Sequence, residues 1–220
     1  MAEKLDNLYL RQLDFIDKDK FDTPICIVGA GATGSFVALF LAKMGMNNIR
    51  LWDFDSVEEH NFPNQMFRME DLNGLKSQKT ADIVRSFTGT RIKYSVNEYK
   101  RQPLEGIVIS AVDSMKMRKQ IYENCIKQGK TKLIVDPRTA GETFRLYTVN
   151  MEIESERKFY EKYFYSDKNT TPIPCTAQAI IYNVGIVSGF VCNQVKRYLM
   201  NEDIKKEVIA DTGNCFYLTK

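Results

Sequence analysis

The sequence predicts an α/β fold with a doubly wound, mainly parallel sheet and an antiparallel C-terminal part. Short apolar runs, typical of buried parallel strands, alternate with amphipathic stretches of helical length over residues 21–140. Beyond Gly141 this alternation gives way to a strand, a long connection, a long apolar helix and a hairpin. With 220 residues and 44% hydrophobic composition, the chain is expected to form one large domain over residues 1–220.

The first elements read as a helix followed by a βαβ unit. Residues 1–20 are expected to form an N-terminal helix that precedes the core. Apolar runs predict strands over 24–29 and 48–55, because each has the composition of a strand buried on both faces. The stretch between them, 33–45, reads as a helix that ends at Gly45. These elements open the core expected over residues 21–140.

The rest of the core repeats the alternation. Helices are predicted over 76–89 and 115–128, and strands over 91–96, 106–113 and 132–136. This order of strands and helices favours helices on both faces of a parallel sheet.

The C-terminal part, residues 141–220, combines a strand, a crossover loop, a long helix and a hairpin. A strand is predicted over 143–154, and the polar, aromatic stretch 155–175 reads as a connection closed by two prolines. The apolar stretch 176–200 is long enough to raise the question of a membrane span, but five amides and hydroxyls interrupt it, so a buried helix is preferred. Gly185 and Gly189 suggest that this helix packs closely against another element. The final hairpin is expected to turn at Asp211 to Asn214.

Composition excludes several classes of function. The formal charge of +3 is far from the concentrated basic surface that binding to nucleic acid needs, so no nucleic-acid partner is expected. His60 is the only histidine, which argues against Ser-His-Asp and Cys-His hydrolase machinery. Five scattered cysteines without a C-x-x-C pair favour neither disulfides nor a cysteine zinc site. The charged N-terminus lacks the apolar core of a signal peptide, so a cytoplasmic location is expected.

A glycine-rich loop joins the first strand to the first helix of the core. Gly29 permits a tight turn, Gly31 lets the backbone approach a phosphate or ribose, and Gly34 lets the helix pack close to the sheet. Asp53 ends the next strand about 20 residues on, where a carboxylate accepts from ribose hydroxyls. This Rossmann-like arrangement predicts a nucleotide site but does not separate NAD from ATP.

The segment after Asp53 favours ATP. A polar loop carries Asp55, Asn61 and Gln65, and Lys76 then opens a helix. A lysine at a helix N-terminus adds its charge to free backbone N–H groups, an arrangement suited to a triphosphate.

At these residues the sequence resembles the ThiF/MoeB/HesA family of adenylating enzymes, which includes the catalytic domain of ubiquitin-activating enzymes. The family pattern places a G-x-G-x-x-G loop, a D-x-D pair, an N-L-x-R-Q segment, a helix-opening lysine and a T-D-N-like turn in this order. The chain matches it in order over most of residues 8–149, with Gly29, Gly31, Gly34, Asp53, Asp55, Asn61 to Gln65, Lys76 and Val112 to Ser114. Arg11 and Gln12 stand where the family has an Arg-Gln pair.

The resemblance implies a mechanism and a set of site residues. The C-terminal carboxylate of a small ubiquitin-like or sulfur-carrier protein ending in Gly-Gly attacks the α-phosphate of ATP. Asp113 is then expected to hold Mg²⁺, Asp53 the ribose and Lys76 the phosphates, and Arg11 is expected to reach the ATP of the other subunit of a homodimer. The other expected nucleotide contacts are Gly29, Gly31, Ala32, Gly34, Asp55, Asn61 and Gln65.

A second step is suggested by Cys175. In ubiquitin-activating relatives the acyl group is transferred to a cysteine before the last long helix, and Cys175 lies in that place. A position near a helix N-terminus favours a thiolate. The remaining cysteines read as core or incidental residues, and a space-filling role stays open for Cys175 itself.

The match departs from the family pattern at one charged position. Asn64 stands where the N-L-x-R-Q segment has its arginine, and Arg68 or Arg138 is a candidate to compensate. The zinc-binding C-x-x-C pairs of many members are absent. Lys79 competes with Lys76 for the phosphates, and Asp113 is also a candidate helix cap.

Other functions remain open at this point. Asn64 is compatible with a catalytically weak or inactive partner subunit, and relatives of this fold also adenylate a peptide C-terminus or a tRNA base. An NAD-dependent oxidoreductase would use the same glycine loop with a different ligand.

Overall fold

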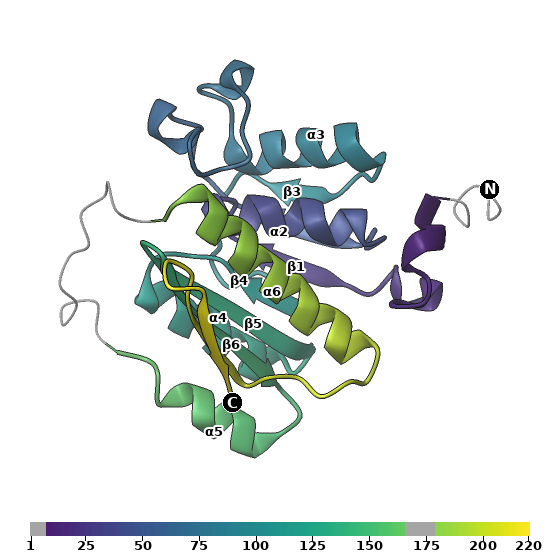
Figure 1. The fold of residues 1–220 in the computed structure, drawn as a ribbon, viewed down its shortest axis with the longest axis vertical. Helices are drawn as coiled ribbons and strands as arrows, with labels where there is room; N and C mark the ends of the chain where they lie inside the picture. The colour runs from purple at the N-terminus through teal and green to yellow at the C-terminus, as the bar shows by residue number, and fades with distance from the viewer. Residues whose placement is uncertain (1–7, 166–178) are drawn as a thin grey trace.

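Short apolar strands form the centre of an eight-stranded sheet in the computed structural model, which describes residues 8–165 and 179–220 (Figure 1). The order across the sheet is β3-β2-β1-β4-β5-β6-β7-β8. Pairing is parallel from β3 to β5 and antiparallel from β5 to β8. The strands are β1 Ile25–Val28, β2 Ile49–Trp52, β3 Lys93–Ser95, β4 Gly106–Ser110, β5 Thr131–Ala140, β6 Thr143–Asn150, β7 Glu207–Asp211 and β8 Phe216–Thr219. The predicted fold class is therefore confirmed.

Helices cover both faces of the sheet (Figure 1). Ile25 and Ile27 of β1 point into a core shared with α2, α3 and α6, whereas Cys26 and Val28 point into a second core shared with α4 and α5. This split follows from the alternation of side chains along a strand. The helices are α2 Ala32–Lys43, α3 Lys76–Thr88, α4 Met115–Gln128, α5 Glu154–Glu161 and α6 Ile181–Leu199.

The long helix α6 lies against α2, with polar side chains that are buried and satisfied. The Asn183 side-chain amide donates to Gly141 O at 2.9 Å and to Thr143 O at 3.1 Å, and Gln194 Oε1 accepts from Lys205 N at 2.8 Å. Among the described helices, none combines the length and apolar character needed to cross a membrane. Among the described residues, the close packing expected at Gly185 and Gly189 is not found, because a Cβ at either position would meet none of their atoms within 4 Å.

Part of the predicted connection 155–175 is helical. Helix α5 forms because Phe159, Tyr160 and Phe164 pack onto the sheet and onto Tyr122 of α4. The Glu156 carboxylate also accepts from Asn150 N at 2.8 Å, which ties the helix to the end of β6. The aromatic residues that suggested an irregular segment are thus the apolar face of a short helix.

Smaller differences between the sequence predictions and the structure concern where strands and helices begin and end. Strand β5 continues to Ala140 because it pairs with β6 along its whole second half. At the N-terminus the described part of the helix expected over 1–20 consists of helical backbone at Leu8 and Tyr9 and two 3-10 turns, η1 Leu10–Gln12 and η2 Lys18–Lys20. The C-terminal hairpin turns between β7 and β8, as expected.

The order of the strands determines where the crevice for a ligand lies. From β1 the chain moves outward to β2 and β3 on one side and then returns to β4 on the other side. In an open α/β sheet, such a reversal leaves a crevice outside the carboxyl ends of the two central strands. The glycine loop follows β1 and Asp113 follows β4, so both lie at this crevice.

Candidate functional site

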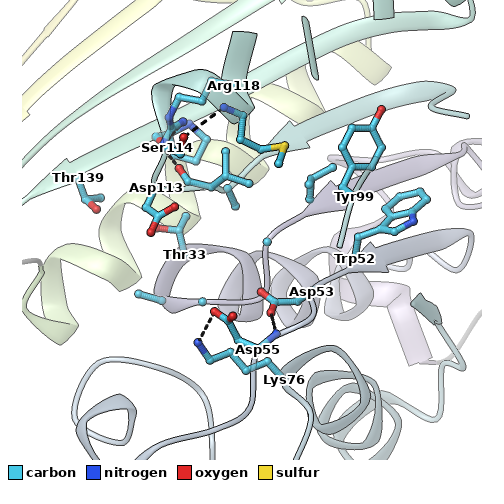
Figure 2. A pocket seen from close by; sticks show the side chains of 18 of the residues that line it. Thr33, Trp52, Asp53, Asp55, Lys76, Tyr99, Asp113, Ser114, Arg118 and Thr139 are labelled. Carbon is cyan, nitrogen blue, oxygen red and sulfur yellow. Dashed lines mark hydrogen bonds and ion pairs between the residues drawn. The ribbon is translucent and has the colours of Figure 1, made fainter. Parts of the chain in front are cut away.

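A cavity of about 960 Å³ opens at the carboxyl ends of β1, β2, β4 and β5 (Figure 2). Its wall combines the glycine loop, the polar segment after β2, the start of α4 and the end of β5. The sequence-predicted residues that line it are Gly29, Gly31, Ala32, Asp53, Asp55, Asn61, Gln65, Lys76 and Asp113. Residues far apart in the sequence therefore meet at one site.

The glycine loop is shaped by two close backbone approaches. Gly29 has φ +100°, and a Cβ there would overlap the Ala111 carbonyl group. A Cβ on Gly34 would overlap the Gly29 carbonyl oxygen. At Gly31, by contrast, a Cβ would meet no atom of the described residues within 4 Å, although the residue lines the cavity. Gly31 therefore leaves free space where a ligand would approach the backbone.

Asp53 joins this loop to the end of β2. Its Oδ2 accepts from Ala30 N at 2.6 Å and its Oδ1 accepts from Asp55 N at 2.8 Å. Burial raises the pKa of the Asp53 carboxyl, and the two backbone donors act in the opposite direction. Each carboxylate oxygen has a second lone pair, so these bonds leave acceptor capacity for a ligand hydroxyl.

Lys76, not Lys79, is the lysine of the cavity. The Lys76 side chain is mostly buried, and its Nζ donates to Asp55 Oδ2 at 3.1 Å (Figure 2). The backbone N of Lys76 also donates to Asp55 O at 2.8 Å, which fixes the start of α3. Lys79 forms an ion pair with the buried Asp71 at 3.5 Å and does not line the cavity.

Asp113 is exposed in the loop between β4 and α4. Figure 2 shows its carboxylate extending toward Thr33 at the start of α2. The helix cap is provided by Ser114, whose side-chain oxygen accepts from Met117 N at 3.3 Å. Since α4 does not use Asp113 as its cap, that carboxylate is available to a ligand.

The polar segment after β2 contributes amides. Asn61 is buried, and its Oδ1 accepts from Glu58 N at 2.9 Å, so its carbonyl stabilises the turn η3 (Glu59–Asn61). Asn64 donates to Ala179 O at 3.2 Å, which connects this segment to the chain two residues before α6. Asn64 Oδ1 and Gln65 Oε1 are buried without a hydrogen-bond partner in the described part of the chain. Two acceptors in the cavity wall are thus not used by any residue that the structure describes.

Two arginines, the buried Arg118 and the mostly buried Arg138, hold the ends of β4 and β5 at the cavity. Arg118 of α4 donates to Ser110 O and Pro137 O, both at 3.1 Å, and contacts the fully buried Asp136. Burial lowers the pKa of Arg118 to about 10, which leaves it charged at neutral pH. Arg138 also contacts Asp136, whose carboxylate accepts from its Nε at 2.8 Å.

Of the two candidates to replace the missing family arginine, Arg138 lines the cavity and Arg68 does not. Arg68 donates to Asp71 at 3.1 Å and pairs with Glu70 at 2.7 Å on the surface of the segment after β2.

Two of the predicted site residues that the structure describes lie elsewhere. Gly34 does not line the cavity and acts through its packing against Gly29. Arg11 is exposed on η1, beside the C-terminal end of α2, where Gln12 Nε2 donates to Lys43 O at 3.0 Å. The 12 residues of α2 separate it from the glycine loop of its own chain by about 18 Å. Cys175 lies outside the described residues.

Several cavity residues were not predicted from the sequence. Trp52 ends β2, Tyr99 follows β3 and Thr139 lies near the end of β5 (Figure 2). They belong to no motif, but each lies at or just beyond the carboxyl end of a strand. That position is itself a signal in an open α/β sheet.

Comparisons with known proteins place these features in a family. The model of the ThiF family matches residues 9–214. An adenylyltransferase and sulfurtransferase MOCS3 of Dictyostelium discoideum is 27% identical over 119 residues, which cover 50% of this chain and 28% of that protein. A ubiquitin-like modifier-activating enzyme 5 of Drosophila virilis is 30% identical over 110 residues, covering 50% and 25%. The matched region thus spans about a quarter of these curated relatives.

Solved structures share the fold at low sequence identity. E. coli MccB, solved with ATP, has a TM-score of 0.72 at 12% identity, covering 92% of this chain and 65% of that one. PaaA has a TM-score of 0.76 at 14% identity, covering 100% and 74%. Both agree with the mixed sheet described above.

Proposed function

The chain belongs to the ThiF family, and from this premise we propose that it uses ATP to adenylate the C-terminal carboxylate of a small ubiquitin-like or sulfur-carrier protein ending in Gly-Gly. The observation that carries the proposal is the convergence of Gly31, Lys76 and Asp113 on one cavity. Its volume of about 960 Å³ is at the upper end of the range for small-molecule sites. The names of the curated relatives, an adenylyltransferase and a modifier-activating enzyme, support this class of reaction.

The residues present fit a nucleoside triphosphate. Gly31 leaves room for a phosphate beside the backbone, and Lys76 supplies a cation at the start of α3. Asp55, the present partner of Lys76, is half exposed, so solvent weakens that ion pair and a phosphate competes with it readily. Asp53 would accept from a ribose hydroxyl with the lone pairs that the backbone leaves free.

Asp113 fits the role of a magnesium ligand. Among the described residues there is no cluster of three or more side chains able to hold a metal. Mg²⁺ commonly binds through one or two carboxylates together with substrate phosphates, so a single exposed carboxylate at the cavity suffices. When bound there, Mg²⁺ would neutralise charge on the phosphate oxygens.

In the proposed reaction, a carboxylate oxygen of the carrier forms a bond to the α-phosphorus of ATP. The bond from that phosphorus to the bridging oxygen breaks, and pyrophosphate leaves with the electron pair. Such transfer depends on positioning and electrostatics and needs no general base, because the attacking carboxylate is already ionised. Lys76 would stabilise the leaving phosphates and the glycine loop would orient the nucleotide.

A homodimer would complete the site. Arg11 lies beside the C-terminal end of α2, too far from the cavity of its own chain to contact a ligand there. In this proposal it therefore reaches the triphosphate bound by the partner subunit. Its exposure supports a contact outside its own chain.

Transfer of the acyl group to Cys175 is a further part of the proposal. Cys26, Cys125 and Cys192 are buried, and burial raises the pKa of each thiol, that of Cys125 to about 11. These three are poor thiolates at neutral pH. Cys215 is exposed but does not line the cavity. The described cysteines therefore offer no strong competitor to Cys175.

Asn64 favours one alternative, a catalytically weak or inactive partner subunit. Its amide carries no charge and is used in the contact with Ala179. Loss of magnesium-dependent ATP binding would favour this alternative. Adenylation of a peptide C-terminus or a tRNA base uses the same nucleotide site and differs only in the acceptor.

The nature of the nucleotide is tested by competition. With Mg²⁺ present, the protein is expected to bind a fluorescent ATP analogue, and unlabelled ATP should displace it at concentrations at least about tenfold lower than NAD, a preference of about 1.4 kcal/mol. The physical reason is that Lys76 and the open space at Gly31 suit a triphosphate. Displacement by NAD at lower concentrations than ATP would instead support an oxidoreductase.

A further inference from the structure

Arg138 has hydrogen-bonding capacity that the fold does not use. Its side chain is 13% exposed and lines the cavity. Of its five N–H donors, Nε donates to Asp136 Oδ2 at 2.8 Å and Nη1 donates to Tyr163 O at 2.9 Å. Nη2 is buried and makes no hydrogen bond within the described residues, although it lies 2.8 Å from the same Asp136 oxygen. Nη2 is thus held by the charge of Asp136 without a well-aligned hydrogen bond, and the guanidinium group keeps N–H donors that a ligand in the cavity could use.

The cluster around Arg138 also carries excess positive charge. Arg118 and Arg138 both contact one carboxylate, that of Asp136, which additionally accepts from Tyr160 OH at 2.8 Å. These four side chains therefore hold two positive charges and one negative charge. The excess is located at the cavity wall, where it attracts an anion.

The position of Arg138 relates it to Asp113. Strands β4 and β5 are parallel, with Ile109 opposite Val135. Asp113 lies four residues beyond Ile109, and Arg138 lies three residues beyond Val135, so the two emerge at the same end of neighbouring strands. Asn64 also lines the cavity, and it offers only an amide where the family pattern has an arginine.

We propose that Arg138 binds the triphosphate of ATP and supplies the positive charge that Asn64 does not. This inference rests on the proposed function, because it assumes that ATP occupies the cavity. The guanidinium group is held over Tyr147, with its centre 4.6 Å from the ring centroid, and by Asp136, so it is pre-oriented for a phosphate. Asp136 and Arg118 act as positioning residues for it.

A purely structural role is the rival explanation. Arg138 neutralises Asp136 and links β5 to Tyr163, so its replacement could weaken the fold without touching a ligand. The two roles differ in one readout. A phosphate contact changes the affinity for ATP but not for adenosine, whereas a damaged fold weakens both.

The experiment compares wild type, Arg138→Gln and Arg138→Lys by calorimetric titration with ATP and Mg²⁺ and with adenosine. Arg138→Gln is expected to weaken ATP binding by about 10- to 100-fold and to leave adenosine binding within about twofold. Arg138→Lys retains the charge but not the planar fork, so its ATP affinity should fall between the other two. If the Gln variant does not fold, the ratio of ATP to adenosine affinity in the Lys variant still distinguishes a phosphate contact from a purely structural role.

Arg145→Gln is the matched control. Arg145 lies directly opposite Arg138 in the β5–β6 pairing, but it is half exposed, pairs with Glu207 at 3.6 Å and does not line the cavity. Its replacement removes the same charge and should leave ATP binding unchanged. An equal loss of ATP and adenosine binding in the Arg138 variants, or unchanged ATP binding in a folded Arg138→Gln, would overturn the inference. Failure of the wild type to bind ATP would instead overturn the proposed function.

Discussion

Replacing Asp113 with asparagine is expected to lower ATP–pyrophosphate exchange by about 10²- to 10³-fold. In the proposed mechanism, this carboxylate holds Mg²⁺ against the phosphates. An amide is a far weaker ligand for a hard divalent cation. The fold should tolerate the change, since Asp113 is exposed and the cap of α4 is Ser114. The measurement is exchange at several Mg²⁺ concentrations, together with a denaturant unfolding curve.

Ser114→Ala provides the matched control for Asp113→Asn. It removes the hydroxyl that caps α4 and should lower the free energy of unfolding by about 1 kcal/mol. Its dependence on Mg²⁺ should remain that of the wild type. The magnesium assignment would be wrong if exchange in Asp113→Asn kept the wild-type rate and magnesium dependence.

The second large effect is expected at Gly34. A methyl group there would overlap the Gly29 carbonyl oxygen and approach Ala111 Cβ to 3.2 Å, and because the overlapping oxygen belongs to the backbone, relaxation is restricted. Gly34→Ala is therefore expected to lower the free energy of unfolding by about 3 kcal/mol, the upper end of the usual cost of overpacking. Chemical denaturation of the purified variant measures this.

Gly31→Ala separates packing from binding in the same loop. A Cβ at Gly31 meets nothing within 4 Å, so the free energy of unfolding should stay within about 1 kcal/mol of the wild type. The added methyl group enters the space proposed for a phosphate, so ATP binding should weaken by about tenfold or more, as measured by titration. A Gly34→Ala protein as stable as the wild type, or a Gly31→Ala protein with unchanged ATP affinity, would contradict this interpretation of the loop.

The parallel half of the fold was predictable because its signals are local. Strands β1 and β4 are short apolar runs buried on both faces, and the helices α3 and α4 each end at a glycine. Gly89 and Gly129, both at positive φ, end these two helices close to the predicted boundaries.

Helix α5 was not predictable from the same signals. It has eight residues, which is too short to be stable alone, and it depends on tertiary contacts of Tyr160 with Asp136, Tyr122 and Tyr147. Those partners come from three other elements, so no local window of the sequence contains the information. The same holds for Gly185 and Gly189, whose surroundings are decided by the packing of α6 as a whole.

Part of the candidate site was likewise predictable from the sequence, and part required the structure. Gly31, Asp53, Lys76 and Asp113 were predicted because each lies next to a strand or helix end, and the structure brings all four to one cavity. The choice of Lys76 over Lys79 required the structure, because it depends on the ion pair between Lys79 and Asp71.

The importance of Arg138 could not be judged from the sequence. Its neighbours belong to β5, to α4 and to the segment after α5. The sequence offered Arg68 and Arg138 as equal candidates, and the ion pairs of Arg68 with Asp71 and Glu70 distinguish them.

Carrier-dependent ATP–pyrophosphate exchange tests the central claim most directly. The wild-type protein is mixed with ATP, Mg²⁺, labelled pyrophosphate and candidate carrier proteins ending in Gly-Gly, and the label appearing in ATP is measured. We expect label in ATP with at least one carrier and none with the same carrier amidated at its C-terminus, because the reaction requires a free carboxylate there. Magnesium-dependent ATP binding with no exchange for any candidate carrier, peptide or tRNA would contradict the adenylation account.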